Sequence, residues 1–136
     1  MKARAILLQE MTTAELRTAQ DIINRSWASI GIKVQFSQHA MTRAMTRDKE
    51  ITMVELITVF NKVKEAHGQE LRAINHQSET YESIIKDRAL EVNIPFVIRY
   101  DQPDNRGTVP MICTTVMRKA IQDFHSNQLT DKELFV

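Results

Sequence analysis

A switch in hydrophobic period at residue 31 is the feature that most constrains the fold of this chain. Before the switch, apolar residues recur every three or four positions, at Leu16, Ala19, Ile23, Trp27 and Ile30. This spacing predicts an amphipathic helix of about five turns, entered through a capping box at residues 12–15. Gly31 is a typical helix stop. Ile32, Val34 and Phe36 then alternate with polar residues, which predicts a short, half-buried strand. We expect the apolar face of the helix to pack on a sheet.

Two more helices are predicted in the first half. Ser37 is placed to cap the second, and Thr52–Glu55 form a capping box before the third. The third helix is marked by apolar residues at helical spacing, namely Val54, Ile57, Phe60 and Val63, and is expected to end near residues 66–68. Residues 71–75 are too weakly patterned for a firm assignment and are compatible with a strand.

The second half has the character of strands. Residues 81–86 fit a strand or a helical turn, and residues 93–100 fit a strand with Pro95 near its start, which indicates an edge position or the first ladder residue. A strong turn signal at 101–107 precedes the best strand pattern, 109–117, so these two strands are predicted to form a hairpin. Helices followed by strands favour an α+β domain with helices on one face of the sheet.

Composition limits the classes of function. A chain of 136 residues is expected to form one domain, 1–136, and a net charge of +1 means that any anion binding depends on local clusters. With Cys113 as the only cysteine there is no intrachain disulfide and no cysteine-based metal motif, which fits a reducing cytoplasm. No signal peptide or membrane span is predicted.

The second predicted helix carries the leading candidate site. His39, Arg43 and Arg47 fall at i, i+4 and i+8, on one helix face. A histidine with two guanidiniums is a poor metal ligand set, but it suits gripping a phosphodiester and moving a proton. The helix start would also disfavour imidazolium and favour phosphate. The alternative is a capping or core-edge histidine, with the arginines as solvent-facing partners of Asp48 or Glu50.

Other candidates lie later in the chain. Arg118 and Lys119 follow the best strand, where a sheet presents residues to a ligand, although a basic pair there is commonly just the point at which the chain leaves the core. Tyr81 fits either a base-stacking role or a place at the edge of the core. The remaining histidines show no metal-binding spacing and are interpreted as surface or loop residues: His67, His76 and His125.

The stretch Phe36-Ser37-Gln38-His39, with Arg43 and Arg47, resembles the phage messenger-RNA endoribonucleases of the RegB type. The resemblance continues through Val54-Glu55-Leu56 and Phe60-Asn61-Lys62-Val63-Lys64 and covers roughly residues 34–64. The spacing His-x-x-x-Arg-x-x-x-Arg, with strands ending in Thr-x-x-Arg, is also similar to the wider class of RelE-like toxins. Those proteins fold as helices packed on a small antiparallel sheet, which is therefore the expected architecture.

This resemblance implies RNA cleavage without a metal or other cofactor, by attack of a ribose 2′-hydroxyl on the adjacent phosphate to give a 2′,3′-cyclic phosphate. His39 matches the position of a catalytic histidine, and Arg43 matches a basic residue one turn later. Arg118 is expected to stabilise the phosphate, because RelE-like folds often place a basic residue late in the sheet. The expected RNA-binding residues are Arg47, Lys49, Lys119 and Tyr81, with RNA, free or on the ribosome, as the partner.

One departure from the family leaves alternatives open. The second catalytic histidine of RegB-type enzymes falls at Asn61, which cannot exchange a proton near neutral pH. Three alternatives follow. Another group such as His67 or His76 supplies the second acid–base role, or His39 catalyses alone and slowly, or the domain binds RNA without cutting it. A non-catalytic module that binds RNA, the ribosome or a host protein is therefore the main rival. A structural or assembly protein of a phage, with His39 in an interface, is a third possibility.

Overall fold

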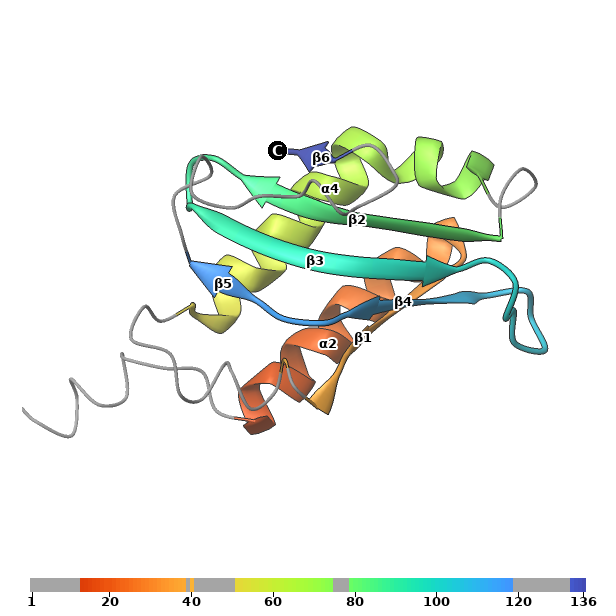
Figure 1. The fold of residues 1–136 in the computed structure, drawn as a ribbon. Helices are drawn as coiled ribbons and strands as arrows, with labels where there is room; N and C mark the ends of the chain where they lie inside the picture. Colours follow the sequence, from red (N-terminus) through yellow and green to blue (C-terminus); the bar gives the residue numbers. More distant parts are fainter. Residues whose placement is uncertain (1–12, 39, 41–50, 75–78, 119–132) are drawn as a thin grey trace, which may run out of the picture.

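A computed structural model describes residues 13–38, 40, 51–74, 79–118 and 133–136. Two helices cover one face of a twisted sheet (Figure 1), so the predicted α+β class, with helices packed on a small sheet, is confirmed. In chain order the elements are α2 (Thr13–Trp27), the short 3₁₀ helix η1 (Ala28–Ile30), β1 (Ile32–Phe36), α4 (Met53–Ile74), β2 (Thr80–Asp87), β3 (Val92–Arg99), β4 (Val109–Cys113), β5 (Met117–Arg118) and β6 (Leu134–Phe135).

The sheet is mixed, which corrects the antiparallel expectation. Its strand order is β1-β4-β3-β2-β6, and β5 pairs with β3 beyond the end of β4. The β2–β3 and β3–β4 pairs are antiparallel. The turn signal at 101–107 predicted the second of these hairpins. The two outer pairs, β1–β4 and β2–β6, are parallel. A hairpin can be recognised from its turn, whereas the partner of an outer strand depends on distant parts of the chain.

The helix and strand on either side of Gly31 follow the predicted periods. Leu16, Ala19, Ile23 and Trp27 are buried on one side of α2, and β1 alternates between buried and more exposed positions. Gly31 has a φ of 71° and donates its N–H to the carbonyl of Ala28 at 3.1 Å, which ends the helical segment in the left-handed conformation that glycine adopts without strain.

Helix α4 begins as predicted but ends later. The Thr52 hydroxyl accepts the N–H of Glu55, and the Glu55 carboxylate accepts the N–H of Thr52, both at 3.1 Å. The helix then runs through Gly68 to Ile74, so the strand interpretation of 71–75 is wrong for residues 71–74. Gly68 is buried against Ile30, whose Cγ2 would lie 3.6 Å from an added Cβ. This glycine therefore marks close packing within the helix and not its end.

An aromatic cluster joins the helices to β1. The rings of Trp27 and Phe60 meet edge to face with centroids 5.5 Å apart, and Phe36 meets Phe60 in the same way at 5.9 Å. The indole Nε1 of Trp27 donates to the carbonyl of Phe60 at 3.3 Å. The core therefore lies between the helices and one face of the sheet. Phe36, the last residue of β1, is anchored in it.

The outer edge of β1 is closed by side-chain amides of α2. The Asn24 side chain accepts the N–H of Val34 at 2.6 Å and donates to the carbonyl of the same residue at 2.9 Å. One turn earlier, the Gln20 carbonyl oxygen accepts the N–H of Phe36 at 2.9 Å. These contacts occupy backbone groups that would otherwise be open to another strand.

At the other edge of the sheet, the backbone of β6 covers the last part of β2, where it pairs with Ile85 and Lys86. Leu134 is fully buried, and Val136 donates its N–H to Lys86 and accepts the N–H of Arg88. The Phe135 ring lies exposed beside the Arg88 guanidinium, 4.5 Å from ring centroid to Cζ. This edge therefore depends on residues far along the chain from β2.

Pro95 occupies the middle of the sheet, which corrects the predicted edge position. It pairs with Ile84 of β2, and its carbonyl accepts the N–H of Thr114 at 3.0 Å. The nitrogen and carbonyl of a strand residue face the same neighbour, so Pro95 turns its missing donor towards the gap between β4 and β5. The strand predicted at 109–117 is interrupted there, between Cys113 and Met117. A proline is tolerated in a central strand at such an interruption.

Candidate functional site

Ser37 fixes the start of the segment that carries the leading candidate. Its hydroxyl accepts the N–H of Ala40 at 3.1 Å and donates to the carbonyl of Thr114 at 3.1 Å. Its own N–H donates to the carbonyl of Cys113 at 3.0 Å. Gln38 and Ala40 are helical, and Ala40 is fully buried. The predicted cap at Ser37 is confirmed, and the helical turn that it starts is bound to the end of β4.

The backbone of Arg118 lies at the same end of the sheet. β1 and β4 run parallel and end together at Phe36 and Cys113. Beyond β4 the chain continues through Thr114 to β5, where Arg118 pairs with Val92 at the start of β3. The hydrogen bonds of Ser37 to β4 therefore link the start of the helical turn to the strand that leads to Arg118.

The structure leaves most of the predicted side chains undescribed. Five of the predicted site residues lie outside the described residues: His39, Arg43, Arg47, Lys49 and Lys119. For Arg118 the structure describes the backbone, which belongs to β5. The predicted convergence of an imidazole and guanidiniums on one phosphate therefore stays a prediction.

Tyr81 is the exception, because its side chain is described and buried. It is 5% exposed and belongs to the hydrophobic core. Its ring stacks on Phe96 of β3 with centroids 5.9 Å apart and an interplanar angle of 9°. A ring held in this way offers no free face to a base, so the RNA-binding assignment of Tyr81 is wrong and the core-edge interpretation holds.

His67 has a structural position that its sequence context does not reveal. Its Nε2 lies 3.0 Å from the carbonyl of Phe135, and its Nδ1 lies 3.9 Å from the carboxylate of Glu70. The side chain is 15% exposed, so the surface interpretation needs correction: His67 joins α4 to β6. His76 and His125 lie outside the described residues, and Asn61 is exposed on α4.

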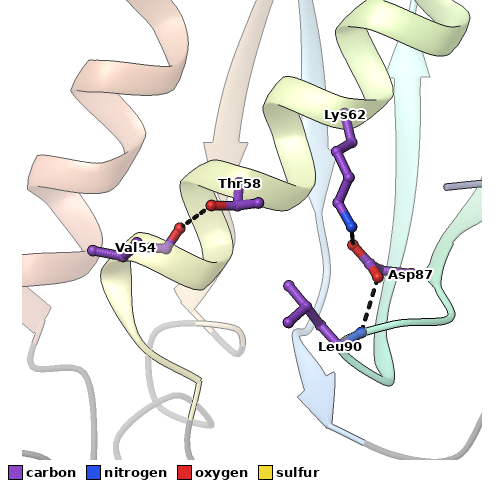
Figure 2. A network of polar contacts seen from close by, with 5 residues as sticks. All are labelled: Val54, Thr58, Lys62, Asp87 and Leu90. Carbon is purple, nitrogen blue, oxygen red and sulfur yellow. Dashed lines mark hydrogen bonds and ion pairs between the residues drawn. The ribbon is translucent and has the colours of Figure 1, made fainter.

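An ion pair between a half-exposed lysine and a buried aspartate joins α4 to the end of β2 (Figure 2). The Asp87 side chain is fully buried, and one carboxylate oxygen lies 2.7 Å from the Lys62 Nζ. Its other oxygen accepts the N–H of Leu90 at 3.0 Å and shapes the turn into β3. Removing one partner of such a pair leaves an uncompensated charge. The pair therefore holds α4 against the end of the sheet at which β3 begins and β5 pairs. No local sequence pattern could have predicted it, because the two residues are far apart in the chain.

Metal and thiol chemistry find no support in the part of the chain that is described. Among these residues, no group of three or more His, Cys, Asp or Glu side chains is placed to hold a metal ion. Cys113 is fully buried in β4, and burial raises the pKa of its thiol, so this cysteine is a core residue and not a nucleophile. None of the described helices is long and apolar enough to cross a membrane.

Comparisons with protein-family models, with curated proteins and with solved structures find no match for this chain.

Proposed function

We propose that this protein is a cytoplasmic, metal-independent endoribonuclease that cleaves messenger RNA. The observation that carries the proposal is the Ser37 cap: the Ser37 hydroxyl accepts the N–H of Ala40 and donates to the carbonyl of Thr114, at the sheet end reached by β5. The positive end of a helix dipole disfavours imidazolium, and only a neutral imidazole accepts a proton.

In the proposed reaction His39 removes the proton of a ribose 2′-hydroxyl, and the oxygen attacks the adjacent phosphorus. The bond to the 5′-oxygen breaks, which leaves a 2′,3′-cyclic phosphate on one fragment and a 5′-hydroxyl on the other. Arg43 and Arg118 neutralise the charge that develops on the phosphorane, and Arg47, Lys49 and Lys119 hold the flanking backbone. The leaving oxygen takes its proton from protonated His39 or from water.

The test is cleavage of total RNA by the purified protein in the presence of EDTA. We expect fragments with 5′-hydroxyl and cyclic phosphate ends, and a rate reduced about 10²–10⁴-fold by His39→Ala. His125→Ala, which removes a histidine with no assigned role, is the control and should leave the rate unchanged. Parental activity in His39→Ala would overturn the mechanism.

A non-catalytic RNA-, ribosome- or protein-binding module is the second candidate. Asn61 favours it, because this exposed amide of α4 stands where the resemblance expects a second histidine. Such a module would bind RNA or ribosomes with an affinity that falls steeply with salt and would produce no 5′-hydroxyl ends. Restored or faster cleavage by Asn61→His would instead favour the enzyme.

A further inference from the structure

A groove lies at the end of the sheet opposite to Ser37. It is formed where η1 passes through Gly31 into β1, with the last turn of α4 on one side and the loop from β3 to β4 on the other, and it has a volume of about 500 Å³. Volumes of this size are typical of small-ligand sites. Gly31 and Gly107 line it, and an added Cβ on either glycine would meet no atom within 4 Å. We call it the Gly31 groove.

Two guanidiniums from distant parts of the chain line the Gly31 groove. Arg72 comes from the last turn of α4, and Arg106 comes from the β3–β4 loop. Both residues are exposed, and neither guanidinium makes a hydrogen bond or ion pair with any described residue. A basic residue in the last turn of a helix is commonly explained by its favourable interaction with the helix dipole alone. Arg106 has no such explanation, because it lies in a loop.

Three of the carbonyls that border the groove already have internal donors. Ala28 accepts from Gly31, Gly31 accepts from Val109, and the carbonyl of Thr108 accepts from Asp104. Nearby, the Tyr100 hydroxyl donates to the carbonyl of Leu71. The Arg72 and Arg106 guanidiniums therefore give the groove an excess of donors, which suits a ligand that brings negatively charged acceptors.

Asp104, an acidic residue of the same loop, is held by backbone donors and does not line the groove. Asp104 accepts the backbone N–H groups of Arg106 and Thr108 at 2.8 and 3.0 Å, which holds the pKa of its carboxyl below the usual range. This single carboxylate faces the charges of both Arg106 and Lys33. Arg72 and Arg106 are the charged residues that line the groove in the described part of the chain, whereas Asp104 and Lys33 do not line it.

We propose that the Gly31 groove binds a phosphate-bearing ligand through Arg72 and Arg106. Both arginines line the groove, and a guanidinium can take two oxygens of a phosphate or pyrophosphate. The groove is separated from Ser37 by the length of β1, roughly 20 Å at the usual strand rise. A polynucleotide could span both sites, whereas a free nucleotide would occupy the groove alone. The proposal does not depend on RNA cleavage.

Backbone amide NMR titration with inorganic pyrophosphate tests the site. We expect saturable shifts at Gly31 and Gly107, with affinity reduced tenfold or more in Arg72→Gln and in Arg106→Gln. Arg25→Gln removes an exposed arginine of α2 that does not line the groove, and its affinity should stay within twofold. The melting temperatures of all three variants confirm that they fold.

Two further titrations identify the source of the phosphate. An RNA oligonucleotide with 2′-O-methyl groups, which the proposed cleavage cannot consume, should displace pyrophosphate if the natural ligand is a polynucleotide. Displacement by adenosine monophosphate but not by this oligonucleotide would assign the groove to small phosphate compounds. Absence of saturable pyrophosphate binding, or equal weakening by Arg25→Gln, overturns the proposal whatever the outcome of the cleavage assay.

Discussion

The outer edge of β1 is closed by side chains of α2, whereas the last part of the outer edge of β2 is covered by the backbone of β6. At the first edge, Asn24 and Gln20 supply the hydrogen bonds that a neighbouring strand would make. At the second, β6 contributes ladder bonds and the buried Leu134, and His67 contacts it from α4. Both edge strands also bury apolar side chains, so the two edges differ in what occupies the outward backbone groups: side-chain amides at β1 and a strand backbone at β2.

The largest effect is expected at the β6 edge. Leu134→Ala removes a fully buried side chain and should lower the free energy of unfolding by about 3 kcal/mol, measured by urea denaturation. Leu134→Met conserves volume and should cost less than about 1.5 kcal/mol. A loss in Leu134→Ala as small as in the methionine variant would mean that β6 is not anchored by burial.

The next largest effect is expected at the β1 edge. Asn24→Ala leaves the N–H and carbonyl of Val34 without their partner and should cost about 2 kcal/mol. The opened edge should also make the protein associate at high concentration, as measured by light scattering. Asn61→Ala, at an exposed helix position, is the control and should stay within about 0.5 kcal/mol.

A smaller effect is expected where α4 meets β6. His67→Leu removes the contact between Nε2 and the carbonyl of Phe135 and should cost about 1 kcal/mol. His67→Gln retains a donor and should recover part of the loss. Equal stability of the two variants would show that the contact contributes nothing to this edge.

The smallest effect is expected for the single amide contact of β1. Gln20→Ala removes one hydrogen bond to Phe36 and should cost about 0.5–1 kcal/mol in the same denaturation assay. Combined with Asn24→Ala, the loss should exceed the sum of the single losses if the two amides close the edge as a unit. Strict additivity would instead describe two independent contacts.

The sequence predicted those parts of the fold that neighbouring residues determine. The Gly31 stop, the strand at Ile32–Phe36, the caps at Ser37 and Thr52 and the hairpin around residues 101–107 each depend on contacts within a few positions. Features set by distant contacts were missed. Gly68 was interpreted as a helix end because its close contact with Ile30 cannot be recognised from spacing, and β6 has no pattern of its own.

Predictions for the candidate site likewise succeeded where neighbouring residues decide the outcome and failed where distant contacts do. The Ser37 cap was predictable from a short polar residue before a helical pattern, and it is confirmed. The sequence did not decide between base stacking and a core-edge place for Tyr81, because its polar neighbours in the sequence alternate onto the other face of β2. Nor could the sequence reveal that Arg72 and Arg106 line one groove, since only the fold brings α4 and the β3–β4 loop together.

The amide contacts of Asn24 also bear on the order of folding. They join residues 10 positions apart, whereas His67 and Phe135 are 68 positions apart. Short loops close at lower entropic cost, so α2 and β1 can associate while later strands are still being synthesised. The outer edge of β2 can pair with β6 only after residues 133–136 have been synthesised. A nascent chain that stalls before them would expose an unpaired strand, and chaperone contact or aggregation should concentrate in that interval.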